Sequence, residues 1–132
     1  MQELNTSVEK NIDSLMSVLR QSVLALCKDI DHQELDYQSA SNFTGQIKAT
    51  VLSFGCRLVE ACFESKDNPV KSVELNGTRY LNKGKSPKTV VTSLGKITVR
   101  RSYYQHRSGG TCVFPLDERL GIKNEYLMAD VK

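Results

Sequence analysis

The sequence lacks the patterns that define membrane and secreted proteins. No window approaches the run of about 18 apolar residues that marks a membrane-spanning helix, and the first residues, MQELNTSVEK, do not combine a basic start with an apolar block. A secretory signal peptide requires that combination. We therefore expect a chain with no membrane span and no signal peptide, located in the cytoplasm.

Signatures of catalysis and of metal binding are scarce as well. The sequence contains no GxSxG, P-loop or HExxH pattern, and its two histidines have no recognisable nucleophile partner. Its cysteines lie in apolar surroundings or predicted strands, without the paired CxxC spacing of a zinc site, so reduced and buried thiols are predicted. They are Cys27, Cys56, Cys62 and Cys112. We expect no cofactor.

Charge is distributed unevenly along the 132 residues, a length typical of one domain. Residues 1–65 contain five Lys or Arg against nine Asp or Glu, residues 66–107 ten against two, and residues 108–132 three against four. The net charge of +3 therefore hides a middle segment of +8 between weakly acidic flanks. Such a segment favours a polyanion as its partner.

Two long amphipathic helices are predicted in the first half, residues 1–66. Thr6 and Glu9 have capping-box spacing, and apolar residues then recur every three or four positions to Ile30. This helix is roughly 35 Å long, more than a small sheet can cover. After a polar turn, a second helix runs from about Ser41 to Glu64. The apolar faces of the two helices can simply pack together as the core. Alternatively, the excess apolar surface of the first helix can mediate homodimerisation or dock another domain.

Short alternating runs of β-forming residues predict an antiparallel β-meander over residues 70–116. Asn76-Gly77 predicts a first hairpin, and the run NKGKSP at 82–87 a mobile basic loop. A further break between strands is expected at Ser108-Gly109-Gly110. Together with a short helical tail at 117–132, these elements give an α+β fold: a helical hairpin followed by a small sheet and a short C-terminal helix.

The central hairpin of that meander is predicted to turn at Ser93-Leu94, with Gly95 as a left-handed bulge that sets Val91 opposite Ile97. Period-two alternation places Ile97 with Val99, Arg101 and Tyr103 on one face, and Thr98 with Arg100, Ser102 and Tyr104 on the other. We expect one face to be core and the other to be wet, cationic and aromatic.

Four short runs follow one another in the second half of the chain: KTV at 88–90, LGKI at 94–97, RRSYY at 100–104 and PLDERLG at 115–121. In this order and spacing, Pro87 to Gly121 resembles the N-terminal region of bacterial insertion-sequence transposases of the acidic-triad (DDE) type, in the Kra and Lre groups. The close match covers about a quarter of the chain. The resemblance implies duplex DNA, in particular transposon ends, as the partner.

Two departures from those transposases limit what the resemblance implies. Many Kra-like members have a Cys-x-x-Cys after the tyrosine pair, whereas residues 105–112 here offer only His106 and Cys112, too few for a tetrahedral zinc site. The family's metal-binding carboxylates lie farther downstream, and this sequence stops at Lys132, so we expect no catalytic activity. Asp117 and Glu118 are interpreted as the N-cap and first-turn acids of a short helix closed by Gly121.

Binding therefore remains as the predicted function. The predicted nucleic-acid-binding residues lie on or beside the basic hairpin: Lys83, Lys85, Lys88, Arg100, Arg101, Tyr104, His106 and Arg107. Cations in such a ribbon can contact phosphates, and tyrosines can bond the backbone or stack on bases. No recognition helix is apparent, so base-specific contacts are not assigned. The alternative is a protein–protein interaction module that dimerises through the first helix or docks another domain, with the basic hairpin merely exposed.

Overall fold

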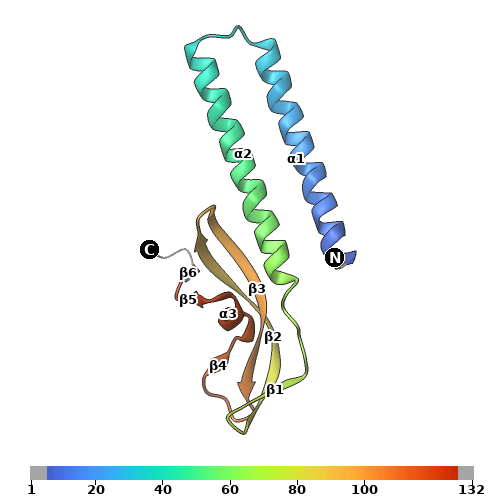
Figure 1. Cartoon of the computed structure of the whole chain (residues 1–132), viewed down its shortest axis with the longest axis vertical. Helices are drawn as coiled ribbons and strands as arrows, with labels where there is room; N and C mark the ends of the chain where they lie inside the picture. Colours follow the sequence, from blue (N-terminus) through green and yellow to red (C-terminus); the bar gives the residue numbers. More distant parts are fainter. Residues whose placement is uncertain (1–5, 128–132) are drawn as a thin grey trace. The chain divides into compact units, whose positions relative to one another are not determined.

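The computed structural model describes residues 6–127, and Figure 1 shows the path of the chain. Its elements are α1 (Thr6–His32), α2 (Tyr37–Glu64), β1 (Ser72–Leu75), β2 (Thr78–Thr92), β3 (Gly95–His106), β4 (Cys112–Val113), α3 (Pro115–Leu120), β5 (Ile122–Lys123) and β6 (Tyr126–Leu127). The predicted α+β class is confirmed. The chain divides into two compact units, Met1–Ala61 and Cys62–Lys132, which we call the helical unit and the sheet unit.

The turn between α1 and α2 is shorter than predicted because α2 begins at Tyr37 rather than near Ser41. Asp36 starts the helix: its Oδ1 accepts a hydrogen bond from the Ser39 backbone N–H at 2.8 Å, while its own N–H donates to Ser39 Oγ at 3.0 Å. This reciprocal pair satisfies two backbone donors at the helix N-terminus. None of the helices among residues 6–127 is long and apolar enough to cross a membrane.

The cap at Asp36 predicts an acid-sensitive α2. The hydrogen bond from the Ser39 backbone lowers the pKa of Asp36 below its ordinary value of 3.8. Stability from a carboxylate with a lowered pKa is present above the unfolded-state pKa and is lost as pH falls through the folded-state pKa. Asn also caps helices but does not titrate, so we expect Asp36→Asn to lose less helicity than the parent between about pH 6 and about pH 3. Circular dichroism measures this, and equal losses would contradict it.

The helical unit has little interior. Along the described parts of α1 and α2, the only buried side chains are those of Val8 and Cys56. The apolar residues of the predicted stripe, such as Leu15 and Leu19, are half-buried. All four cysteines are free thiols, and Cys27 is exposed, which corrects the prediction that it is buried.

The sheet unit is built around the long β2–β3 hairpin, with sheet order β4-β3-β2-β6-β5 and β1 paired to β2. Neighbouring strands are antiparallel except β2 and β6, which run parallel. The predicted first hairpin is confirmed, because Asn76 (φ 52°) and Gly77 (φ 78°) both have the positive φ of a type I′ turn. The central turn differs by one residue from the prediction: Val90, not Val91, pairs with Ile97, and Thr92 pairs with Gly95.

The run NKGKSP is part of β2 and not a mobile loop. Pairing with β3 continues through it, with a β-bulge at which Lys83 has no cross-strand partner between the pairs Asn82–Tyr104 and Gly84–Tyr103. Gly84 supplies the positive φ of 113° that the bulge requires, and its N–H donates to Asn82 Oδ1. Tertiary pairing therefore overrides a local composition that is typical of loops.

The segment after β4 is only partly as predicted. Helix α3 starts after Phe114 with Pro115 at its first turn, so Asp117 lies inside the first turn and is not the N-cap. Gly121 closes the helix in the left-handed conformation, as predicted. The helical tail proposed for 117–132 is wrong over residues 122–127, where β5 and β6 form a small hairpin; residues 128–132, Val131 included, lie outside the described residues.

Candidate nucleic-acid interface

Arg101, one of the predicted nucleic-acid-binding residues, lies in the core of the sheet unit and does not project into solvent. Arg101 is 4 % exposed and lies on the same face of β3 as Ile97 and Val99. The guanidinium forms a bidentate ion pair with Asp117 of α3, at 2.8 Å from Nε to Oδ1 and 2.9 Å from Nη2 to Oδ2. Nη1 donates to the Ser86 carbonyl at 2.8 Å, and the guanidinium carbon lies 4.0 Å from the centroid of the Phe114 ring. Arg101 therefore holds α3 against the sheet.

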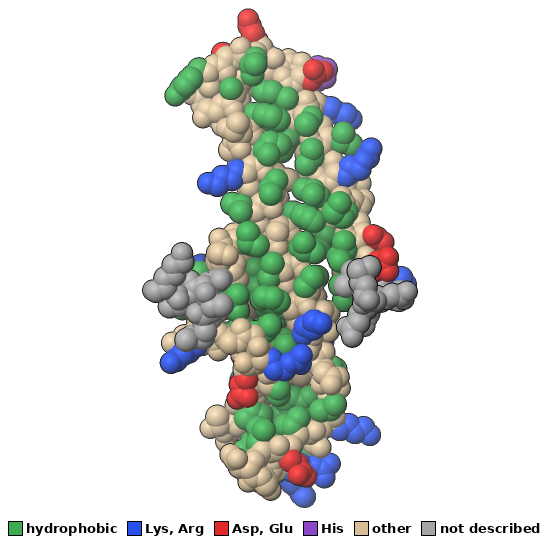
Figure 2. All heavy atoms as spheres, viewed as in Figure 1, with side chains coloured by type: hydrophobic (Ala, Val, Ile, Leu, Met, Phe, Trp, Pro, Cys, Tyr) green, Lys and Arg blue, Asp and Glu red, His purple; other side chains and the backbone are tan. Residues whose placement is uncertain are grey.

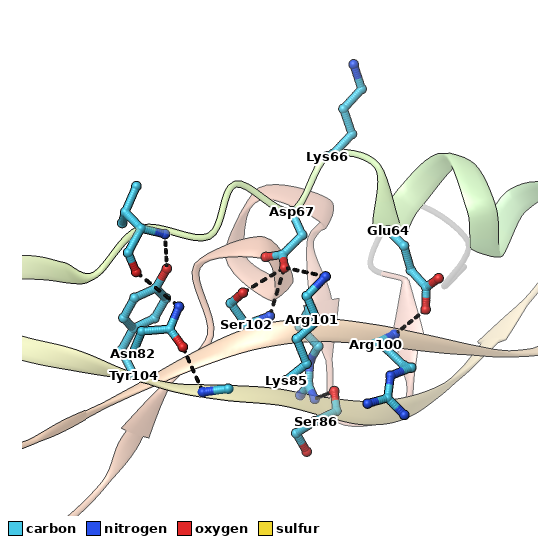
Figure 3. Close-up of polar contacts among 12 residues, drawn as sticks. Glu64, Lys66, Asp67, Asn82, Lys85, Ser86, Arg100, Arg101, Ser102 and Tyr104 are labelled. Atoms are coloured by element: carbon cyan, nitrogen blue, oxygen red, sulfur yellow. Dashed lines mark hydrogen bonds and ion pairs between the residues drawn. The ribbon is translucent and has the colours of Figure 1, made fainter. Parts of the chain in front are cut away.

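The opposite face of β3 is also covered near Tyr104, which is 2 % exposed. The segment that leaves α2 crosses this part of the strand, where the Val70 backbone N–H donates to the Tyr104 hydroxyl at 3.1 Å (Figure 3). Because the ring and the hydroxyl are both engaged, Tyr104 cannot stack on a base without local opening. The prediction that Tyr104 is available to contact nucleic acid on a solvated, aromatic face is therefore wrong.

Two acids, Glu64 at the end of α2 and Asp67 in the segment after it, bond the outer edge of β3, as Figure 3 shows. Glu64 Oε1 accepts from the Arg100 backbone N–H at 2.6 Å. Asp67 Oδ2 accepts from both the backbone N–H (3.1 Å) and the hydroxyl (2.7 Å) of Ser102, and it lies 3.7 Å from the ammonium nitrogen of Lys85. These carboxylates satisfy amides that β4 is too short to reach. They also lower the positive charge available around Lys85.

The other predicted residues lie in different settings. Lys83, Arg100 and Arg107 are exposed, and no other described residue binds their side chains. Lys88 is half-buried opposite Val99. His106 Nδ1 accepts a hydrogen bond from the Ser108 backbone N–H at 3.1 Å, so its ring is anchored in the turn before β4 and its proton, when the ring is neutral, is on Nε2.

The structure brings one further cation to this set. Arg79 on β2 and Arg107 after β3 line an open hollow of about 350 Å³ together with Leu81 and His106. Leu81 pairs with Gln105, so the residues two positions outward, Arg79 and Arg107, are level on the same face. The sequence did not indicate Arg79, because the residue beside it depends on the register across the β-bulge. Glu74 lies opposite Arg79 on β1, but the described residues show no ion pair between them.

The match to a protein family covers most of this architecture. The model of an uncharacterised protein family, UPF0236, matches residues 35–130. The chain belongs to this family. No curated protein and no solved structure matches the chain. The UPF0236 match includes α2 and every described strand, so the Arg101–Asp117 pair, the acids on the β3 edge and the Arg79–Arg107 hollow all lie within it, whereas α1 lies outside.

Proposed function

We propose that the chain is a non-catalytic DNA-binding module of a transposase-like protein. The observation that carries this proposal is the hollow between Arg79 and Arg107, where two exposed guanidinium groups and an imidazole face the same space. Guanidinium groups recognise phosphate by bidentate, charge-assisted hydrogen bonds. Exposed Lys83 and Arg100 lie on the same β2–β3 hairpin and add two further cations outside the hollow.

The resemblance of Pro87–Gly121 to transposase N-terminal regions favours duplex DNA over other polyanions. In the structure, the runs that carry this resemblance form the β2–β3 hairpin and α3. Arg101, Tyr104 and Asp117 of these runs hold the sheet unit together. Their role is therefore to shape the hairpin, and the phosphate contacts fall to residues at its surface.

The proposed contacts are to the DNA backbone. No described helix presents a row of exposed cations beside the hairpin, so the sequence-independent phosphate term dominates binding. Four exposed cations, Arg79, Lys83, Arg100 and Arg107, give an expected log–log salt slope of about −4, at roughly −0.9 for each phosphate contact. Without the ion-paired Lys85 and the buried Arg101, fewer contacts are available than the sequence alone indicated.

Binding to a short duplex across a salt series tests this proposal. We expect the double substitution Arg79→Gln and Arg107→Gln to weaken binding tens of fold at about 0.1 M salt and to make the slope shallower by roughly 2, because two phosphate contacts are lost. Lys28→Gln with Lys123→Gln removes the same charge from exposed sites elsewhere and should change neither. Undetectable or salt-insensitive binding by the parent chain would refute the proposal.

A second candidate function is protein–protein interaction without nucleic-acid contact. The specific observation in its favour is the helical unit, in which Val8 and Cys56 are the only buried side chains along the described parts of two long helices. Isolated helix pairs are marginal unless their apolar faces are covered. A parent chain that does not bind DNA would leave this candidate standing.

A further inference from the structure

The apolar arc of α1 is wider than one neighbouring helix can cover. Leu15, Leu19 and Leu26 lie on one side of the helix and are half-buried. At 3.6 residues per turn, Met16 and Val23 lie further round the helix. Met16 is 50 % exposed and Leu24 is 40 % exposed. A surface helix with a single neighbour needs only one apolar stripe, on the side that faces this neighbour. The apolar residues on a second side of α1 therefore indicate a second neighbour.

Exposed apolar surface lies on both sides of the seam between α1 and α2. One open hollow, of about 310 Å³, lies between the helices and is lined by residues including Leu15, Val18, Leu19 and Phe54. Another, of about 570 Å³, lies along α1 and is lined by Asp13, Met16, Ser17, Leu19, Arg20, Val23 and Leu24. Leu19, which is half-buried in the seam, lines both hollows, and the α1 hollow lies on the side of Met16 and Val23. Figure 2 shows hydrophobic side chains running down both helices of the hairpin.

We propose that a second copy of this chain covers this surface, with the two α1 helices packed antiparallel about a two-fold axis between Met16 and Ser17. The charges that bracket the α1 hollow support this choice of partner. Asp13 and Arg20 are equally far from that axis, at about 5 Å along the helix for a rise of 1.5 Å per residue. Antiparallel packing therefore brings each Asp13 level with Arg20 of the second copy. The contact is self-complementary, as a two-fold interface requires, and the small Ser17 at its centre permits close approach.

The size of the surface fits a stable dimer. The 27 residues of α1 give a helix about 40 Å long, and two helices side by side are about 20 Å wide, so one face of the hairpin offers about 800 Å². A stable protein–protein interface takes about that area from each partner. The assembly that results is a four-helix bundle, in which every helix has two neighbours. This inference develops the second function proposed above and does not depend on DNA binding.

Sedimentation equilibrium of the full chain with charge-swapped variants tests the register. Asp13→Arg places two arginines opposite each other on both sides of the two-fold axis, and Arg20→Asp does the same with two aspartates. We expect each single substitution to weaken the dimer about ten- to a hundred-fold. The double variant restores both attractions and should dimerise like the parent. Both residues are exposed, so circular dichroism should show unchanged helicity. Lys28→Asp, at an exposed site outside the hollow, is the control and should dimerise like the parent.

Two results would overturn the proposal. A parent chain that is monomeric at tens of micromolar would mean that something other than a second copy covers the helices. A dimer that the single substitutions do not weaken, or that the double swap does not restore, would exclude the antiparallel α1 register. The salt-dependence experiment separates these failures from failure of DNA binding, because its test substitutions, at Arg79 and Arg107, lie in the sheet unit and those here lie in α1.

Discussion

Replacing Asp117 by alanine is expected to lower the free energy of unfolding of the sheet unit by about 3–5 kcal/mol, the usual cost of removing one partner of a buried ion pair. The Arg101 side chain is 5 % exposed and that of Asp117 is 18 % exposed, so water can replace little of the lost interaction. Arg101 would keep its bond to the Ser86 carbonyl and its contact with Phe114, but not its counter-charge. In a domain of 60–100 residues, about 1 kcal/mol corresponds to about 4–8 °C in Tm.

Glu118→Ala provides the matched control, because Glu118 is the neighbouring acid in the same helical turn and is exposed. We expect its effect to stay within about 0.5 kcal/mol. Urea denaturation followed by tyrosine fluorescence reports mainly on the sheet unit, which contains four of the five tyrosines. Equal effects of the two substitutions would show that the ion pair adds nothing to stability. Arg101→Ala should unfold the same unit, so lost DNA binding in that variant would not identify a DNA contact.

The helices could be predicted from sequence because their signal is local. Apolar residues at intervals of three and four positions extend over most of α1 and α2, and the error at the start of α2 came from a cap pair, Asp36 with Ser39, that differs from the usual Ser/Thr with Glu/Gln. The strand composition also predicted the β2–β3 hairpin. Its register was wrong by one residue, because the sequence does not determine whether Gly95 is a bulge or pairs across from Thr92.

The candidate site could be predicted only in part, because composition does not show which cations the protein uses internally. The period-two pattern correctly placed Arg101 on the same face of β3 as Ile97 and Val99, but it did not indicate that this face is the core. A buried arginine needs an anion, and Asp117 follows it at a distance along the chain that no local pattern connects. Arg79 was missed for the related reason that its neighbour, Arg107, is set by long-range strand pairing. The predicted cations that are exposed and bound by no other described residue are Lys83, Arg100 and Arg107. They carry no local pattern that distinguishes them from Lys85, which forms an ion pair with Asp67.

The second large effect is expected for Asp67→Ala, which should lower the free energy of unfolding of the sheet unit by about 2–4 kcal/mol. Ser102 is 1 % exposed, and its backbone N–H and its hydroxyl both donate to Asp67. Removing the carboxylate leaves two buried donors without an acceptor, at about 1–3 kcal/mol each before relaxation. Loss of the ion pair with Lys85 adds little, because the Lys85 side chain is 46 % exposed.

A double-mutant cycle with Ser102→Ala separates the two donors, since that substitution removes the hydroxyl but keeps the backbone N–H. We expect Asp67→Ala to cost less in the Ser102→Ala background, with an interaction energy of at least about 0.5 kcal/mol. Asn68→Ala, at the exposed neighbouring residue, should change stability by less than about 0.5 kcal/mol. Asp67→Ala also removes a negative charge beside Lys85, so at a temperature where the variant stays folded it should bind DNA more tightly than the parent. A variant as stable as the parent would mean that water reaches the β3 edge and replaces the carboxylate.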